Sequence, residues 1–469
     1  MPPRAIDLKG YGLPYWLDIE RPRYPALDTA TRADAVVIGA GIAGLKLADY
    51  LSARGLSCVV LEAKRVGEGA SSRNQGCIVT GLPVSYADLA AARSRAVARG
   101  LVALCHHNQE LLEEQIERHG IDCDYEVLGE ILLVRGDEAD HEQTLVGLRR
   151  DAAMMAEDGF AVDCPDAAEV RAATGNPLFA GGIRHRRDAQ FHSGRFVVGL
   201  GEAVARSPLV RIFEESPVAA IEPPEGGGPH LVRTARGSVT AGHLCVATNA
   251  LVPQLLPELT PAFRAERGQV LVTAPLDDRP CRGCFAAGQA WWREIREADG
   301  RYRLLFGGCR DRDEPDSLFP QYGADGRRSR RIASAGFRPT VAHQRRIHAH
   351  LGEIFPHLAD APVTHRWGGL QSFTFDGLPA VGLFDPERRV HGMAGFSGYG
   401  NSYSNVGAAH LAARIAGAGD GLAPPFAESL KLLMPPARPG LRWPGGEPTG
   451  AQCDSLAGQR ESGESAARR

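Results

Sequence analysis

The stretch "ADAVVIGAGIAGLKLADYLSARGLSCVVLEA", residues 33–63, decides the fold of this chain. Its first apolar run ends at Gly39, a stretch with helical apolar spacing follows, and a second apolar run occupies residues 58–61. This order predicts a strand, a helix and a second strand. Gly39, Gly41 and Gly44 form G-x-G-x-x-G between the first strand and the helix, which is typical of a dinucleotide-binding unit.

Each glycine of the motif has a separate physical role. Gly39 permits the tight turn, Gly41 lets a pyrophosphate approach the backbone, and Gly44 lets the helix lie close to the strand. The helix begins near Ile42, where its free amides and partial positive charge favour a phosphate. Glu62 follows the second strand, where a carboxylate accepts hydrogen bonds from an adenosine ribose. An acid at this position disfavours a 2′-phosphate, and therefore NADP.

The segment "KRVGEGASSRNQGCIVTGLP", residues 64–83, favours FAD over NAD. In a nicotinamide enzyme the chain continues into another crossover helix, whereas this segment is long and has no apolar periodicity. A long bare loop suits a cofactor that extends across the domain. We place Ser71 near the pyrophosphate and the backbone of residues 74–78 beside a ring system. The expected cofactor contacts of this unit are Gly39, Gly41, Ile42, Gly44, Glu62, Ala63, Ser71, Arg73, Asn74, Gln75 and Gly76.

Several further segments occur in an order that is similar to a known family. They are "PYWLDIERPRYP" (14–25), "GASSRNQG" (69–76), "SPVAAIE" (216–222), "LCVATNA" (244–250), "HRWGGLQSFTFDGLPAVG" (365–382) and "GFSGYGNSYSNVGAAHLAARIAG" (395–417). Together they resemble the FAD-dependent amine and amino-acid oxidoreductases, which include D-amino-acid oxidase, glycine oxidase, sarcosine oxidase and D-amino-acid dehydrogenase. The γ-glutamylputrescine oxidoreductase branch looks most similar, although Ser72 and Gln75 replace two glycines of its loop.

The resemblance implies further cofactor contacts. Val218 and Ala247 fall on the segments that surround adenine, and Gly398, Gly400 and Asn401 fall on the turn and helix start beside the flavin. Donors at that helix start favour the negative charge of reduced flavin. We expect noncovalent FAD. A thioether to Cys77 is the alternative, but family members that link FAD through cysteine do so from a later segment.

The resemblance also implies an α/β fold with a Rossmann-like FAD-binding domain and a second α+β substrate domain on a mostly antiparallel sheet. After a leader (1–29), we place the FAD-binding domain at 30–85, 193–255 and 366–425, the substrate domain at 86–192 and 256–365, and a disordered tail at 435–469. Within the substrate domain, residues 86–118 predict one long helix, and "GEILLVR", "RGQVLVTAPL" and "RYRLLFGG" predict strands.

Substrate contacts are harder to assign than cofactor contacts. Amino-acid oxidases of the family often hold the substrate carboxylate with an arginine where this chain has Gln371, which cannot form a charged fork. A simple α-amino acid is therefore disfavoured, unless Arg310 replaces that arginine. Tyr399, in the turn expected beside the flavin, is a further cavity-lining candidate. His192 is interpreted as a helix cap or a core residue. No catalytic residue is assigned.

Composition excludes some alternatives. The formal charge of −3 favours neither nucleic acid nor an anionic membrane, and no span or signal core is visible, so we expect a cytoplasmic protein. Ten scattered cysteines indicate reduced thiols, and the C-x-x-C at Cys281 and Cys284 has no second pair for a metal. Sarcosine oxidases resemble one another in a lysine that assists the reaction with oxygen, and this chain has no lysine between Lys64 and Lys431. This absence favours a dehydrogenase that uses another electron acceptor, but O₂ stays open because D-amino-acid oxidases lack that lysine.

The sequence therefore predicts an FAD-dependent oxidoreductase that converts an amine, or a modified amino acid, to an imine that water then hydrolyses. Two alternatives remain open at this stage. One is a flavin-dependent hydroxylase that uses NADPH, and the other is a noncatalytic FAD-binding subunit of a larger complex.

Overall fold

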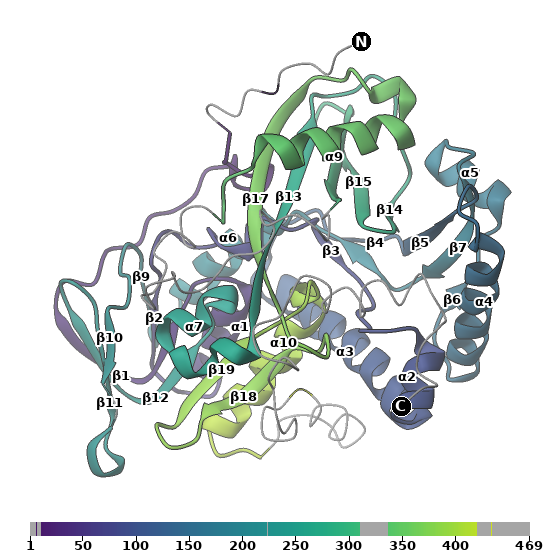
Figure 1. Cartoon of the computed structure of the whole chain (residues 1–469). Coiled ribbons are helices and arrows are strands. Elements are labelled where there is room, and N and C mark those ends of the chain that lie inside the picture. The colour runs from purple at the N-terminus through teal and green to yellow at the C-terminus, as the bar shows by residue number, and fades with distance from the viewer. Residues whose placement is uncertain (1–5, 7–10, 223, 310–335, 420–432, 434–469) are drawn as a thin grey trace.

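The computed structural model describes residues 6, 11–222, 224–309, 336–419 and 433 (Figure 1). The predicted tail, the last residues of the third FAD-binding piece and Arg310 lie outside these residues. Within them the chain forms two eight-stranded sheets and one small three-stranded sheet. This architecture confirms the predicted α/β fold class.

The first sheet contains the strand, helix and strand predicted from residues 33–63. Its strands are β1 (Ala30–Ile38), β2 (Cys58–Leu61), β9 (Val210–Phe213), β10 (Ala220–Glu222), β11 (His230–Arg233), β12 (Ser238–Val246), β18 (Ala380–Asp385) and β19 (Val390–Ala394). Strand β1 pairs in parallel with β2 and with β12, and β2 pairs in parallel with β9. Strands β10 and β11 form an antiparallel extension beyond β12.

Helices cover both faces of this sheet. The α-helices of the described residues are α1 (Ile42–Ser52), α2 (Tyr86–Ala92), α3 (Arg95–His119), α4 (His141–Glu157), α5 (Ala167–Thr174), α6 (Ser193–Ala205), α7 (Val252–Leu255), α9 (Val341–Ile354) and α10 (Gly400–Ile415). Because side chains alternate along a strand, Val37 packs in one cluster with α1, α3, α6 and α10, whereas Val36 packs on the other face with α7.

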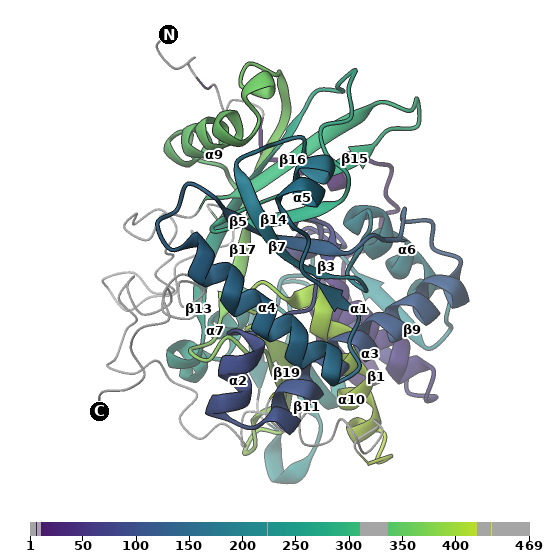
Figure 2. The ribbon, with the colours of Figure 1, turned by 90° about the vertical axis from the view of Figure 1, so that its right-hand side faces the viewer.

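The second sheet is mostly antiparallel, as predicted. Its strands are β5 (Glu130–Arg135), β6 (Val162–Asp163), β7 (Phe179–His185), β13 (Arg264–Thr273), β14 (Cys284–Ala287), β15 (Ala290–Arg296), β16 (Tyr302–Gly308) and β17 (Val363–Phe373). One face packs under α9, where Trp292 stacks on Phe285 and Phe306. Helix α9 lies on the side of this sheet remote from β1 and β2 (Figures 1 and 2). The small sheet comprises β3 (Cys77–Ile78), β4 (Glu126–Val127) and β8 (Ala189–Gln190).

The prediction of a single helix over residues 86–118 is wrong in one respect. The chain forms α2 and α3, with a break between them at Arg93 and Ser94. The hydroxyl of Ser94 accepts a hydrogen bond from the amide of Val97 and so caps α3. Helix α3 then packs in the same apolar cluster as α1 and α10. The predicted domain boundaries, which assign α3 to the substrate domain, stay a prediction.

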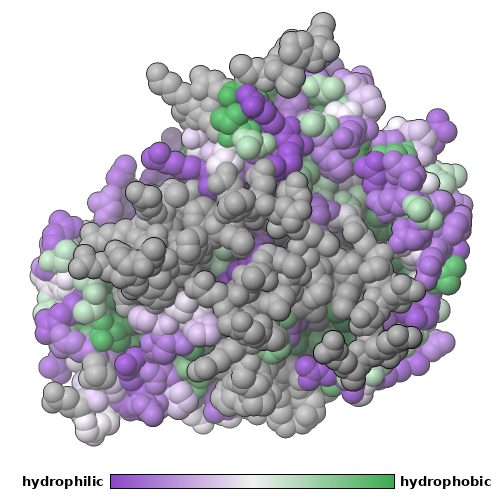
Figure 3. Space-filling view, in the orientation of Figure 1, coloured by the Kyte–Doolittle hydropathy of each residue, from purple (hydrophilic) through white to green (hydrophobic). Residues whose placement is uncertain are grey.

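On the face shown in Figure 3, hydrophilic and hydrophobic residues are interspersed over the coloured surface. Among the helices of the described residues, none is both long enough and apolar enough to cross a membrane.

Candidate cofactor and substrate site

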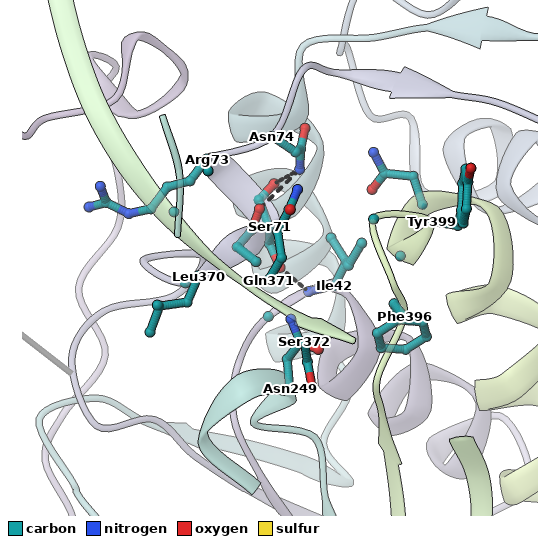
Figure 4. A pocket seen from close by; sticks show the side chains of 18 of the residues that line it. Ile42, Ser71, Arg73, Asn74, Asn249, Leu370, Gln371, Ser372, Phe396 and Tyr399 are labelled. Carbon is teal, nitrogen blue, oxygen red and sulfur yellow. Dashed lines mark hydrogen bonds between the residues drawn. The ribbon is translucent and has the colours of Figure 1, made fainter. Parts of the chain in front are cut away.

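A cavity of about 510 Å³ lies between the carboxyl ends of β1 and β2 and the second sheet. Its wall includes the turn before α1, the loop that follows β2, strands β13 and β17, the β14–β15 hairpin and the turn before α10 (Figure 4). The carboxyl ends of parallel strands are where open α/β sheets bind ligands. The sequence motifs from distant parts of the chain therefore meet around one space.

The three glycines of G-x-G-x-x-G lie so close to neighbouring atoms that a side chain would not fit at any of them. Gly39 has φ +108°, and a Cβ there would lie 2.8 Å from the carbonyl oxygen of Ala247. A Cβ on Gly41 would lie 2.8 Å from Oγ of Ser71, and one on Gly44 would collide with the carbonyl oxygen of Gly39. Gly39 and Gly41 line the cavity, whereas Gly44 serves the packing of α1 on β1.

The end of the cavity next to the glycine turn has the donors and acceptors that a dinucleotide needs. The amide of Ile42 donates to Oγ of Ser71 at 2.9 Å, so this hydroxyl lies at the N-terminus of α1. Glu62 accepts one hydrogen bond on each carboxylate oxygen, from the amides of Ala40 and Lys64, both at 2.9 Å. Each oxygen retains a second acceptor position for a ribose hydroxyl. Burial raises the pKa of Glu62, although both backbone donors oppose this effect.

The loop after β2 is held by its own side chains. Asn74 Nδ2 donates to the carbonyls of Ala70 and Ser71, and the amide of Gly76 donates to Asn74 Oδ1. A Cβ on Gly76 would lie 2.6 Å from the carbonyl oxygen of Phe191. A side chain larger than hydrogen does not fit at Gly76, because the backbone of the loop lies directly against the backbone of Phe191. Gly76 itself lies outside the described cavity lining, in contrast to Asn74 and Gln75.

Arg73 has a different environment from the one expected for a cofactor contact. Its backbone region lines the cavity, but its guanidinium points away from the other labelled residues (Figure 4). That group donates to the carbonyls of Gly12, Glu68, Phe337 and Gly368. Arg73 therefore ties the loop to the leader and to β17.

The remaining predicted contacts converge on the same cavity. Its lining includes Ala63, Val218, Ala247, Gln371, Gly398, Tyr399, Gly400 and Asn401. Gln371 extends from β17 into the cavity, and Tyr399 lies on the side opposite Arg73 (Figure 4). The Tyr399 ring packs over Gly81, where a Cβ would lie 2.6 Å from it. The turn before α10 depends on positive φ at Ser397 (51°) and Gly398 (94°).

The sequence predicted strands that could form a roof over the flavin, but it did not predict which side chains line that roof. Leu132, Ala286 and Trp291 lie side by side in β5, β14 and β15, and Val270 of β13 also lines the roof. Glu130 lies two residues before Leu132 on the same face of β5, and it adds a carboxylate to the cavity lining. Alternation along each strand was the available signal. The register between strands, which brings these residues together, was not readable from the chain.

The expectation of reduced cysteines is wrong at one pair. Cys77 and Cys284 form a disulfide that joins β3 to the start of β14, across 207 residues of sequence. Cys77 lines the cavity, and its sulfur is bonded to Cys284. Cys281 of the C-x-x-C is a buried free thiol. Among the described residues, no cluster of three histidine, cysteine or acidic side chains is arranged to hold a metal ion.

Comparison with known proteins identifies the family. The model of the DAO family, FAD dependent oxidoreductase, matches residues 34–414. The chain belongs to this family. The predicted resemblance is thereby confirmed, and the chain is an FAD-dependent oxidoreductase. The glycine turn, the Glu62 acceptors and a cavity of about 510 Å³ fit FAD.

Individual members of the FAD-dependent oxidoreductases are distant in sequence. The γ-glutamylputrescine oxidoreductase of Escherichia coli (strain K12) is 26% identical over 404 residues, which cover 84% of each chain. Glycine oxidase from Geobacillus kaustophilus has a TM-score of 0.66 at 20% identity, covering 84% of this chain and 98% of that one. L-Proline dehydrogenase from P. horikoshii has a TM-score of 0.67 at 18% identity, covering 87% and 99%. These two structures show the shared fold.

Proposed function

We propose that this protein oxidises the carbon–nitrogen bond of an amine, or of a modified amino acid, to an imine that water then hydrolyses. Noncovalent FAD supplies the hydride acceptor when it is bound. Membership of the DAO family supports the proposal, as does similarity to a γ-glutamylputrescine oxidoreductase and to a glycine oxidase. The commitment of Cys77 to a disulfide supports noncovalent binding.

The observation that carries the proposal is the division of the cavity into two chemically different parts. One part has the glycine turn, the α1 N-terminus and Glu62, which suit the ADP moiety. The other lies under the apolar side chains of Leu132, Val270 and Trp291. An apolar roof keeps water away from a reacting carbon and leaves the orientation of the substrate to a few polar groups.

The charges of the lining favour an amine without an α-carboxylate. Among the lining residues that the structure describes, Arg73 and Lys64 are cationic. Backbone carbonyls already occupy the guanidinium of Arg73, and Lys64 lies beside Glu62, at the end of the cavity next to the glycine turn. Gln371 is neutral, and Glu130 is acidic. A cationic or neutral amine suits this combination better than a free carboxylate does.

The proposal is tested by anaerobic mixing of the purified holoenzyme with a panel of monoamines, diamines and α-amino acids. We expect amines without an α-carboxylate to bleach the flavin absorbance faster than their α-amino-acid counterparts. Bleaching by NADPH alone would favour a hydroxylase. Bleaching by no amine would favour a noncatalytic FAD-binding subunit. Admitting O₂, or an artificial acceptor, to the reduced enzyme then shows whether the acceptor is oxygen.

A further inference from the structure

The first turn of α10 is fastened to the cavity wall. Three consecutive side chains donate to alternate carbonyls of the segment 77–81: Asn401 to Cys77 at 2.9 Å, Ser402 to Val79 at 2.6 Å and Tyr403 to Gly81 at 2.5 Å. Cys77, Val79 and Thr80 of this segment line the cavity, as do Gly400 and Asn401 of the helix. The helix start and the wall segment therefore form one unit.

Asn108 of α3 holds the same turn through a second set of hydrogen bonds. Its Nδ2 donates to the carbonyl of Asn401 at 2.8 Å, and its Oδ1 accepts from the amides of Asn405 at 2.8 Å and Val406 at 3.3 Å. A regular helix joins the carbonyl of residue 401 to the amide of residue 405. The carboxamide of Asn108 thus contacts both members of that pair. It is fully buried and lies outside the described cavity lining.

The contact continues from α10 to α1. Ser404 Oγ accepts a hydrogen bond from Nζ of Lys46 at 2.9 Å, and both side chains are buried. The donors around Asn405 orient its amide oxygen toward Nζ of Lys46 and the amide of Leu112, each at 3.2 Å. Buried polar groups of this kind fix the relative position of the helices that carry them. The N-termini of α1 and α10 both open onto the cavity.

We infer that Asn108 is a positioning residue for the cofactor, which it does not touch. By holding the carbonyl of Asn401 and the amide of Asn405, it sets where the first-turn amides of α10 lie. In a regular helix the first-turn amides have no acceptor and carry its partial positive charge; here the amide of Ser402 donates to the carbonyl of Tyr399 at 3.0 Å. The inference rests on the proposed function in taking this end of the cavity as the one that receives the flavin ring, where such donors stabilise negative charge.

The test compares Asn108→Ala with Asn176→Ala. Asn176 is a matched control because it is also buried, accepts from the amide of Leu178 at 2.8 Å and donates to the carbonyl of Ile354, in the second-sheet region. We expect both variants to lower the melting temperature. Only Asn108→Ala should weaken FAD binding to the apoprotein, by about tenfold, and shift the flavin absorption bands and midpoint potential of the holoenzyme.

A second variant keeps the inference testable if Asn108→Ala fails to fold. Asn108→Asp has nearly the same shape and makes both contacts only while its carboxyl is protonated, so its affinity for FAD should fall with rising pH relative to the native chain. If Asn108→Ala binds FAD as tightly as Asn176→Ala, or Asn108→Asp follows the native pH profile, the positioning role is overturned. Bleaching of native holoenzyme by no amine would overturn the proposed function instead.

Discussion

Trp16 donates its indole N–H to the backbone carbonyl of Asn74 at 2.8 Å, and this bond joins the leader to the loop after β2. The indole is fully buried and contacts the place where a Cβ of Gly76 would lie. The guanidinium of Arg293 lies over the Trp16 ring and donates to the carbonyl of Gly76. The leader therefore packs against the loop after β2 and holds its backbone in place.

This relationship predicts that Trp16→Phe loosens the loop. The variant loses one buried hydrogen bond and leaves the carbonyl of Asn74 without its indole donor. We expect a loss of about 1–3 kcal/mol in unfolding free energy and weaker FAD retention on gel filtration. Trp292→Phe is the control, because the buried indole N–H of Trp292 has no hydrogen-bond partner. Equal FAD loss in both variants would contradict the supporting role of Trp16.

The glycine turn predicts a contrast between two alanine substitutions. Gly41→Ala places a Cβ 2.8 Å from Oγ of Ser71, at the N-terminus of α1. We expect FAD to bind at least about tenfold more weakly, measured by fluorescence titration of the apoprotein. Gly147→Ala, on α4 and outside the cavity lining, meets nothing within 4 Å and should bind FAD as the native chain does. Normal affinity in Gly41→Ala would place the pyrophosphate elsewhere.

Lys46 predicts a pH-dependent stability. Burial lowers its pKa to about 7, against an ordinary 10.5 in the unfolded chain. Between these pH values the unfolded chain binds more protons at Lys46 than the folded chain does. The contribution of Lys46 to the free energy of unfolding therefore rises with pH from about 7 toward 10, and it is lost as the pH falls through that range. Lys46→Met should therefore gain stability over the native chain near pH 7, by roughly 2–5 kcal/mol, and the gain should shrink toward pH 10.

The measurement for Lys46→Met is urea unfolding of both chains at several pH values. Arg236→Met is the control, because Arg236 is exposed and lies outside the cavity lining, so its removal should leave the pH dependence nearly unchanged. A stability difference between Lys46→Met and the native chain that is independent of pH would show that Lys46 is protonated in the fold at every pH tested.

The disulfide predicts a thiol count. The chain has ten cysteines, of which Cys77 and Cys284 are joined. Denatured protein prepared without reductant should show two fewer reactive thiols than the same protein after reduction. A peptide that contains both cysteines should appear in the unreduced digest. Ten thiols before reduction would show that the bond is absent from the purified protein.

Local signals explain what the sequence predicted well. The glycine turn, Glu62 and the loop after β2 lie within one continuous segment, where spacing and sterics determine the structure. His192 was interpreted as a cap or core residue, and its ring accepts from the amide of Arg195 at the start of α6. The start of α10, with Gly398 and Gly400, was likewise readable from its own residues.

Long-range register explains what the sequence did not predict. Trp291 lines the cavity because β15 pairs with β14, and β14 with β5, so the roof depends on contacts between strands far apart in the chain. Cys77 and Cys284 are 207 residues apart, and nothing in either local segment indicates the partner. Asn108 reads as an ordinary helix residue until α3 is placed against α10.

The central claim is the oxidation of a carbon–nitrogen bond, and the most direct test is an anaerobic single turnover with product analysis. The holoenzyme is mixed with one equivalent of an amine that bleaches its flavin, and the carbonyl compound released by hydrolysis is trapped and quantified. The account predicts one carbonyl product for each flavin reduced. Flavin reduction without a carbonyl product would contradict it.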